Sequence, residues 1–185
     1  MRVTSGLAKG TRLKTASRAA TRPTSDMVKE AVFNALAPRL EGARVLDLFA
    51  GAGGLGIEAL SRGADTAVFV ERDARSAAAI RDNLRAAQLE GHGQVRRANA
   101  VTEVASLAAA GARFDVIVLD PPYGQELAGR TLRAIAASGA LAPGGVAVAE
   151  GHWRDDPGEI EGLRRTRTAR YGETAVWYYE TAEGA

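Results

Sequence analysis

Residues 43–56 read Ala-Arg-Val-Leu-Asp-Leu-Phe-Ala-Gly-Ala-Gly-Gly-Leu-Gly, an apolar run that ends in a glycine-rich loop. A second apolar run, 114–119, ends in Asp120-Pro121-Pro122-Tyr123. Short apolar runs bounded by turn residues are typical of strands buried on both faces of a parallel sheet. The carboxyl ends of such strands share one edge, where ligands bind in the crevice. The sequence therefore predicts that the two loops face each other across one cleft.

The rest of the chain alternates in the same way. We expect strands over 44–49, 66–71, 94–98, 114–119 and 145–150, separated by helices over 54–62, 73–88, 101–110 and 126–137. A further helix, capped by Thr24, Ser25 or Asp26, should precede them and end at Pro38. Residues 163–170 and 174–180 read as a hairpin. This order predicts an α/β doubly wound sheet with helices on both faces and an antiparallel pair at its end.

Composition narrows the class of protein. The length of 185 residues favours one domain, and 46% hydrophobic and 25% charged residues are ordinary for a globular protein. The chain has no cysteine, which excludes disulfides, thiolate metal sites and a cysteine nucleophile. The two histidines lie far apart in sequence, which argues against a histidine metal centre. Because we find neither a secretory signal nor a long apolar run, we expect a cytoplasmic protein with no membrane partner.

The net charge of +2 is unevenly distributed. Residues 1–25 contain six basic side chains and no acidic one, whereas the remainder has 18 basic and 22 acidic residues. A basic arm on a mildly acidic body indicates a polyanionic partner, although a merely solvated tail has the same composition. Gly6 and Gly10 in this segment suit a short hairpin or extended arm over 1–24, followed by one domain over 25–185. A smaller basic cluster at 164–170 is compatible with one face of a strand.

The loop Gly51-Ala52-Gly53-Gly54-Leu55-Gly56 matches G-x-G-x-x-G between a strand and a helix. Glu71 ends the next predicted strand, where a carboxylate can accept hydrogen bonds from ribose hydroxyls. The alternative is a tight turn beside an exposed acid. Asp47 would repel a pyrophosphate but suits an ammonium group, which favours S-adenosylmethionine over a dinucleotide. Asn99 is placed either to contact an adenine edge or to form a turn.

The Asp120–Tyr123 tetrapeptide suits recognition of an exocyclic amine. Two prolines stiffen the backbone and remove two N–H donors, so Asp120 and the Pro121 carbonyl become acceptors at a set separation. These two acceptors can hold the amine hydrogens so that the nitrogen lone pair points at an electrophile. Tyr123 can stack on a base, which must be flipped out if it belongs to a helix. The alternative is a Pro-Pro turn with Tyr123 as a core aromatic.

These segments resemble motifs of class I S-adenosylmethionine-dependent methyltransferases that act on exocyclic amines. Residues 22–34, Arg-Pro-Thr-Ser-Asp-Met-Val-Lys-Glu-Ala-Val-Phe-Asn, are similar to the N-terminal signature of the RsmD family. Residues 56–64, Gly-Ile-Glu-Ala-Leu-Ser-Arg-Gly-Ala, and 171–174, Tyr-Gly-Glu-Thr, match two further signatures of that family. The resemblance spans nearly the whole chain.

The resemblance implies methylation of N2 of one guanine in 16S rRNA of the small ribosomal subunit or its assembly intermediate. It also implies a Rossmann-like fold with a seven-stranded, mostly parallel sheet, an antiparallel last strand and a basic N-terminal hairpin that contacts RNA. No metal is required, and we expect a monomer. The expected catalytic residues are Asp120, Pro121, Pro122 and Tyr123. The expected cofactor-binding residues are Asp47, Phe49, Gly51, Gly53, Gly56, Glu71, Asn99 and Ala100, and the expected RNA-binding residues are Arg2, Lys9, Arg12, Lys14 and Arg22.

Three other functions share part of this pattern. An adenine-N6 or cytosine-N4 DNA methyltransferase would use the same acceptor loop, but such enzymes usually carry a separate target-recognition segment. An NAD-dependent dehydrogenase would explain the glycine loop and Glu71 but would leave the Asp-Pro-Pro-Tyr segment without a role. A non-catalytic RNA-binding module would explain the basic arm but not the glycine loop.

Overall fold

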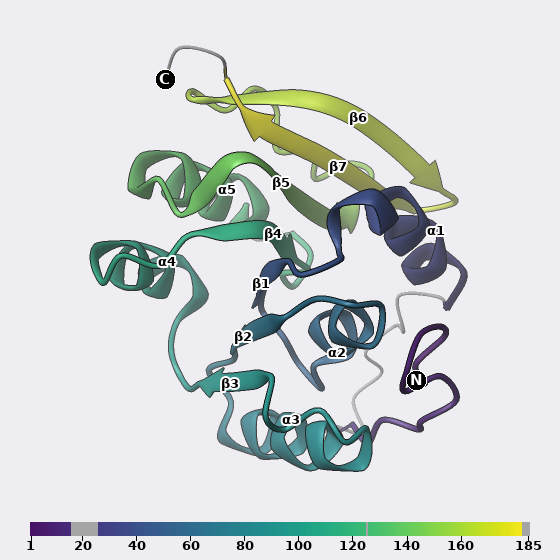
Figure 1. The fold of residues 1–185 in the computed structure, drawn as a ribbon. Coiled ribbons are helices and arrows are strands. Elements are labelled where there is room, and N and C mark those ends of the chain that lie inside the picture. Colours follow the sequence, from purple (N-terminus) through teal and green to yellow (C-terminus); the bar gives the residue numbers. More distant parts are fainter. Residues whose placement is uncertain (16–25, 125, 183–185) are drawn as a thin grey trace.

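The computed structural model describes residues 1–15, 26–124 and 126–182. Figure 1 shows their arrangement as a central sheet covered by helices. In chain order the elements are α1 (Asp26–Leu36), η1 (Ala37–Arg39), β1 (Arg44–Leu48), α2 (Gly54–Ser61), β2 (Thr66–Val70), α3 (Ala74–Ala86), β3 (Gly93–Arg96), α4 (Ala100–Ala109), β4 (Phe114–Leu119), α5 (Leu127–Ser138), β5 (Leu141–His152), β6 (Leu163–Tyr171) and β7 (Thr174–Thr181).

The seven strands form one sheet in the order β3-β2-β1-β4-β5-β7-β6. The pairs among β1 to β5 are parallel, and β7 is antiparallel to both of its neighbours, β5 and β6. The predicted doubly wound α/β fold with an antiparallel last strand is therefore confirmed. The predicted C-terminal hairpin also forms, but its second strand lies inside the sheet and β6 lies at the edge. Only pairing between distant segments sets this order.

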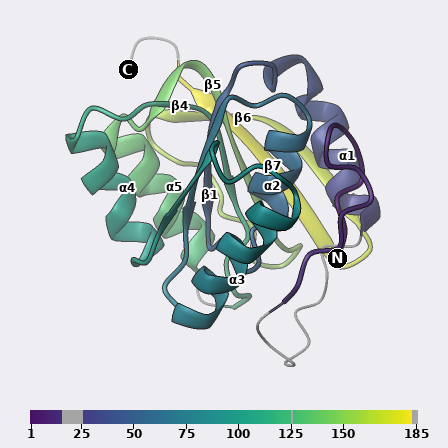
Figure 2. The same ribbon diagram turned by 60° about the horizontal axis from the view of Figure 1, so that its bottom comes forward.

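Helices cover both faces of the sheet, as Figure 2 shows: α4 and α5 lie on one side, and α1, α2 and α3 lie on the other. The side chains of each strand alternate between two apolar cores because successive residues of a strand point to opposite faces. Val45, Val116 and Val148 pack with the side that carries α1, α2 and α3. Leu46, Ile117 and Ala149 pack with α4 and α5.

Most predicted element boundaries lie within one or two residues of the observed ones. The main exception is β5, which begins at Leu141 rather than at 145. Pro143 and two glycines therefore lie within the strand, and the register with β4 shifts between Phe114 and Val116. Pro38 ends the first helix as predicted, because α1 stops at Leu36 and a 3₁₀ turn contains the proline. Of its predicted caps, Thr24 and Ser25 lie outside the described residues, and Asp26 is the first helical residue.

Residues 1–13 form a short hairpin in which Arg2 and Arg12 pair in antiparallel fashion. Its apolar side chains Val3 and Leu13 are buried in the main core. For residues 1–15 the alternative of a solvated tail is therefore wrong, since the hairpin packs on the body of the protein. The remainder of the predicted arm, from residue 16 to 24, lies outside the described residues.

A buried polar network attaches this hairpin to α2. Glu58 accepts hydrogen bonds from the Thr4 amide (2.9 Å) and hydroxyl (2.7 Å), and it pairs with Lys29 (3.2 Å) and Arg62 (2.8 Å). Burial opposes ionisation of Glu58, but these hydrogen bonds and charges outweigh it and lower its pKa. The Ser61 hydroxyl accepts a further amide hydrogen bond, from Ala8 (2.9 Å).

Within the described part of the chain, no helix is long and apolar enough to span a bilayer.

Candidate active site

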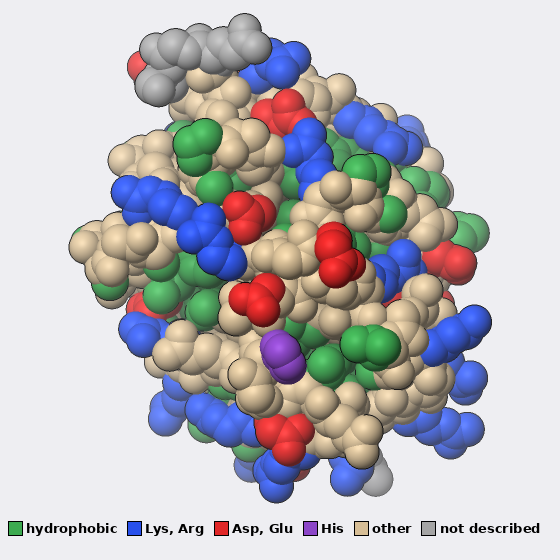
Figure 3. Space-filling view, in the orientation of Figure 1, with side chains coloured by type: hydrophobic (Ala, Val, Ile, Leu, Met, Phe, Trp, Pro, Cys, Tyr) green, Lys and Arg blue, Asp and Glu red, His purple; other side chains and the backbone are tan. Residues whose placement is uncertain are grey.

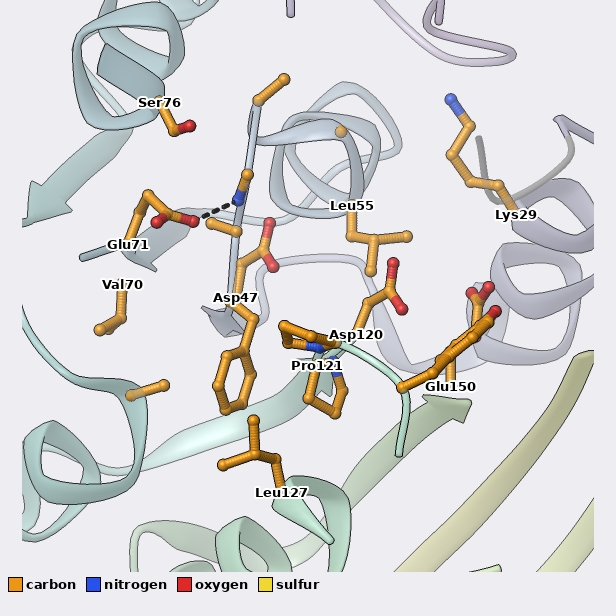
Figure 4. Close-up of a pocket in the computed structure, with 18 of the residues that line it drawn as sticks. Lys29, Asp47, Leu55, Val70, Glu71, Ser76, Asp120, Pro121, Leu127 and Glu150 are labelled. Carbon is orange, nitrogen blue, oxygen red and sulfur yellow. Dashed lines mark hydrogen bonds between the residues drawn. The ribbon is translucent and has the colours of Figure 1, made fainter. Parts of the chain in front are cut away.

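A cleft of about 1000 Å³ lies at the carboxyl ends of the parallel strands. Figure 4 shows residues of the loops after β1 and β4 facing this space together. The predicted meeting of the two motifs is therefore observed. Its lining includes ten of the twelve predicted catalytic and cofactor residues: Asp47, Phe49, Gly51, Glu71, Asn99, Ala100, Asp120, Pro121, Pro122 and Tyr123.

The chain turns sharply from β1 into the glycine loop. Phe49 has a φ of 61°, a left-handed conformation that is unusual for a residue with a side chain. Gly51 and Gly53 follow with φ values of 55° and 80°, which glycine adopts without strain. Gly53 is also the N-cap residue of α2. The loop therefore directs the start of α2 at the cleft.

The three glycines of the G-x-G-x-x-G pattern, Gly51, Gly53 and Gly56, differ in what surrounds them. A Cβ on Gly51 would have no atom within 4 Å, and this residue lines the cleft. A Cβ on Gly53 would lie 3.1 Å from Ile80, and one on Gly56 would lie 2.3 Å from the Phe69 ring. Neither Gly53 nor Gly56 is in the cleft lining. Gly53 allows close packing against α3, Gly56 allows close packing of α2 against β2, and Gly51 allows close approach from the cleft.

Asp47 lies at the base of the cleft, between Glu71 and Leu55 in Figure 4. It is 1% exposed, and its carboxylate accepts a hydrogen bond from the Gly56 amide at 2.8 Å. Burial raises the pKa of Asp47 to about 7; the Gly56 hydrogen bond opposes this shift, and the nearby charges of Asp120 and Glu71 add to it. The carboxylate thus holds the loop in place, and its ionisation would be favoured by a cation in the cleft.

Glu71 connects the glycine loop to the end of β2. One carboxylate oxygen accepts from the Gly51 amide at 2.9 Å, drawn in Figure 4, and the other accepts from the Asp73 amide at 2.8 Å. The carboxylate is half-buried and lines the cleft. Since each carboxylate oxygen can accept more than one hydrogen bond, Glu71 retains acceptor capacity toward a ligand.

Asn99 caps α4: its side-chain oxygen accepts from the amides of Val101 (3.0 Å) and Thr102 (3.4 Å). This is the turn-forming interpretation of the residue. Asn99 is nevertheless exposed and lines the cleft with Ala100, beyond the end of β3. Both therefore border the same space as Gly51 and Glu71.

The Asp-Pro-Pro-Tyr segment forms the opposite wall of the cleft. Asp120 is half-buried, Pro121 is buried, and Tyr123 is 39% exposed, so the interpretation of Tyr123 as a core aromatic is wrong. The Tyr123 ring meets that of His152 edge-on, with centroids 6.1 Å apart. Gly124 ends the segment and donates its amide to Asp155 at 3.0 Å.

Glu150 lines the cleft and was not predicted from the sequence. It is 5% exposed near the end of β5, and in Figure 4 its side chain points toward the same space as Asp120. Val118 of β4 pairs with Asp47 of β1 and with Val148 of β5. Asp120 lies two residues beyond Val118, and Glu150 lies two residues beyond Val148. Because side chains alternate along a strand, all three acids belong to one sheet face. An acid that ends the apolar run 146–149 was the available sequence signal.

Other unpredicted residues complete the walls. Met1 of the hairpin and Thr15, which follows the hairpin, line one side, and Tyr171, Glu173 and Thr174 at the β6–β7 turn line another. The predicted RNA-binding residues are not in the cleft lining: Arg2, Lys9, Arg12 and Lys14 are exposed on the hairpin, and Arg22 lies outside the described residues. The described residues contain no group of three or more His, Asp or Glu side chains that could hold a metal ion.

Known proteins resemble this chain along its length. The "Putative rRNA methyltransferase YlbH" of Bacillus subtilis (strain 168) is 42% identical over 182 residues, which cover 97% of this chain and 98% of that protein. The "Ribosomal RNA small subunit methyltransferase D" of Escherichia coli (strain K12) is 36% identical over 142 residues, which cover 77% of this chain and 70% of that protein.

Solved structures share the fold as well. "Putative methyltransferase yhhF from Escherichia coli" superposes with a TM-score of 0.85 at 30% identity, covering 98% of this chain and 97% of that one. The family model described as "Conserved hypothetical protein 95" matches residues 1–180. The chain therefore belongs to this family, that of the RsmD-type methyltransferases.

Proposed function

We propose that this protein transfers a methyl group from S-adenosylmethionine to the exocyclic N2 of a guanine in 16S rRNA. The observation that carries the proposal is the cleft itself, in which a glycine-loop wall and an Asp-Pro-Pro-Tyr wall face one space. The names of the relatives, which are rRNA methyltransferases, agree with an RNA substrate.

The residues of the first wall fit S-adenosylmethionine. The open side of Gly51 admits close approach of the ligand, Glu71 offers acceptors to ribose hydroxyls, and Asn99 with Ala100 borders the expected adenine position. Asp47 suits the ammonium of the methionine part, because a cation would offset the burial of its carboxylate. A dinucleotide would instead place a pyrophosphate beside this acid, which disfavours NAD.

The second wall fits an aromatic amine. Asp120 and the Pro121 carbonyl accept the two hydrogens of the amine, and Tyr123 holds the base plane at the rim. When bound, S-adenosylmethionine would supply an activated methyl group: the N–C bond would form as the S–C bond breaks, a thioether would leave, and the methylated amine would release one proton to water. Because the electrophile is already charged, positioning by these residues supplies most of the rate enhancement.

Glu150 supports guanine over the other bases. Guanine presents an N1–H donor beside its N2 amine, whereas adenine N1 and cytosine N3 are acceptors beside theirs. A carboxylate on the same sheet face as Asp120 can accept from N1–H of guanine and would repel the lone pair of the other two bases. This argument disfavours an adenine-N6 or cytosine-N4 methyltransferase.

The test is methyl transfer to small subunits, or to 16S rRNA, that lack the modification, with the product nucleoside identified by mass spectrometry. We expect N2-methylguanosine at one position. Methylated adenine or cytosine would contradict the base assignment, and no transfer to either RNA substrate would contradict the function. Glu150→Gln should lower the rate on guanine, while Glu180→Gln, an acid outside the cleft, serves as the control.

A further inference from the structure

The arginines of β6 differ in whether they form an ion pair with a described acidic residue. Arg164 pairs with Glu180 at 3.4 Å, and Arg165 pairs with Asp156 at 2.5 Å. Their charges are therefore largely matched within the protein. Arg170, at the end of β6 nearest the cleft, has no acidic partner among the residues that the structure describes.

Arg170 is held in another way. Its guanidinium lies over the ring of Trp153 at 4.2 Å from the centroid, and its Nε donates to the Gly172 carbonyl at 2.8 Å. Arg154 lies over the same ring at 5.1 Å and likewise forms no ion pair with a described residue. Trp153 is 37% exposed, so one indole at the surface contacts two guanidinium groups that form no ion pair with a described residue.

Trp153 and its two arginines connect directly to the Asp-Pro-Pro-Tyr wall of the cleft, here called the acceptor wall. Tyr123 at the rim contacts His152 edge-on, and the His152 and Trp153 rings lie with centroids 6.0 Å apart. The Trp153 amide also donates to the Glu173 carbonyl at 2.9 Å, which joins the end of β5 to the β6–β7 turn. A chain of rings thus runs from the cleft to the two arginines.

We propose that Trp153, Arg154 and Arg170, here called the arginine clamp, bind backbone phosphates of a single-stranded RNA segment next to the base held in the cleft. Arginine presents a planar fork that suits phosphate, and stacking on an indole orders it in advance. A flipped base leaves its neighbouring phosphates close to the rim, within the region that Tyr123 and His152 border. The clamp rests on the proposed function only in its choice of RNA as ligand.

Local arrangement rather than overall charge supports this site. On the face drawn in Figure 3, Lys and Arg side chains are distributed with acidic ones among them, rather than gathered in one patch. Two acids that follow Trp153 in the chain are engaged elsewhere: Asp156 pairs with Arg165, and Asp155 accepts from the Gly124 amide. Within the described part of the chain neither clamp arginine forms an ion pair, so both can bind a phosphate.

The test is the salt dependence of RNA binding by the full-length protein, with unmodified 16S rRNA fragments as the probe. Each phosphate contact to a single strand contributes about −0.7 to the slope of log K against log salt. The double variant Arg154→Gln/Arg170→Gln should therefore bind with a slope shallower by about 1.4, and roughly tenfold or more weakly at low salt. Its affinity for S-adenosylmethionine and its single-turnover rate at saturating RNA should match those of the wild type.

Two controls separate the clamp from general charge and from folding. Arg164→Gln removes one positive charge from β6, the strand that carries Arg170, at a site paired with Glu180, and it should leave the slope unchanged. Trp153→Phe should retain RNA binding, whereas Trp153→Leu should weaken it although both arginines remain. The thermal midpoint of each variant reports whether the fold is retained.

A wild-type slope in the double variant would overturn the clamp, and so would an equal loss in Arg164→Gln. These outcomes are independent of the proposed reaction. If the wild type binds RNA but transfers no methyl group, the proposed function fails while the slope still tests the clamp.

Discussion

The two walls of the cleft are built differently. On the cofactor side, buried or half-buried side chains hold the glycine loop: Asp47 binds the Gly56 amide, Glu71 binds the Gly51 amide, and Asn83 binds the Ala52 carbonyl at 2.9 Å. On the acceptor side, two prolines have no amide hydrogen to donate, and the segment reaches the exposed Tyr123. The first wall is held by side-chain hydrogen bonds to the loop backbone, whereas the second is stiffened by its two prolines.

The largest expected effect concerns the acceptor wall. Asp120→Ala should lower the single-turnover rate of methyl transfer by about 10²-fold or more, because the amine loses one of the groups that orient it. The affinity for S-adenosylmethionine, measured by calorimetry, should change little. Asp120→Asn should retain part of the activity, since an amide oxygen still accepts. Near wild-type turnover in Asp120→Ala would remove this segment from the active site.

The affinity for S-adenosylmethionine should depend on pH through the ionisation of Asp47. With a pKa near 7, Asp47 is largely protonated at pH 6 in the free protein, and a bound ammonium would favour its ionised form. Binding should then release a proton, so the affinity for S-adenosylmethionine should rise about tenfold per pH unit from pH 5 to 6 and level off above 7. Calorimetry in two buffers of different ionisation enthalpy measures the release directly. A flat profile would contradict the pairing, and Asp47→Asn should abolish the dependence.

Substitutions at Gly51 and Gly56 test whether one glycine of the loop serves cofactor binding and the other serves packing. Gly56→Ala places a Cβ 2.3 Å from the Phe69 ring and should lower the free energy of unfolding by about 1–3 kcal/mol. Gly51→Ala meets no protein atom and should lower stability by about 1–2 kcal/mol through its positive φ alone, but it should weaken cofactor binding more. Thermal melts with and without S-adenosylmethionine distinguish the two. Equal cofactor affinity in Gly51→Ala and wild type would contradict the assignment of its open side.

We expect the N-terminal hairpin and the residue after it to bind RNA through their positive charges. Arg2, Lys9, Arg12 and Lys14 are exposed, and replacing all four by Gln should make the salt slope of RNA binding shallower by about 3, at −0.7 to −0.9 per contact. Charge substitutions are preferable to truncation, because Met1 and Thr15 line the cleft and Val3 and Leu13 are buried. An unchanged slope would leave the hairpin with a structural role only. Cofactor affinity should stay at its wild-type value.

The smallest expected effect is that of Tyr123→Phe. If the ring acts by stacking, loss of the hydroxyl should change the rate by less than about threefold, whereas Tyr123→Ala should lose the roughly 1–3 kcal/mol of a base–aromatic contact. Comparison of KM and kcat for RNA separates the two variants. A severe defect in Tyr123→Phe would instead assign the role to the hydroxyl.

The sequence by itself determined the fold class and the two motifs of the cleft, because strand-length apolar runs and glycine or proline loops are local patterns. It also placed Asp47, Glu71 and the Asp-Pro-Pro-Tyr segment at strand ends. Only the tertiary structure decided that Gly51 lines the cleft whereas Gly53 and Gly56 do not, since Phe69 and Ile80, which are distant in sequence, pack against Gly53 and Gly56. The sequence also could not show that Glu150 lies near Asp120, because the pairing of β4 with β5 brings them together. Nor could it show the arginine clamp, because Arg170 and Trp153 come from separate segments that meet only in the folded chain.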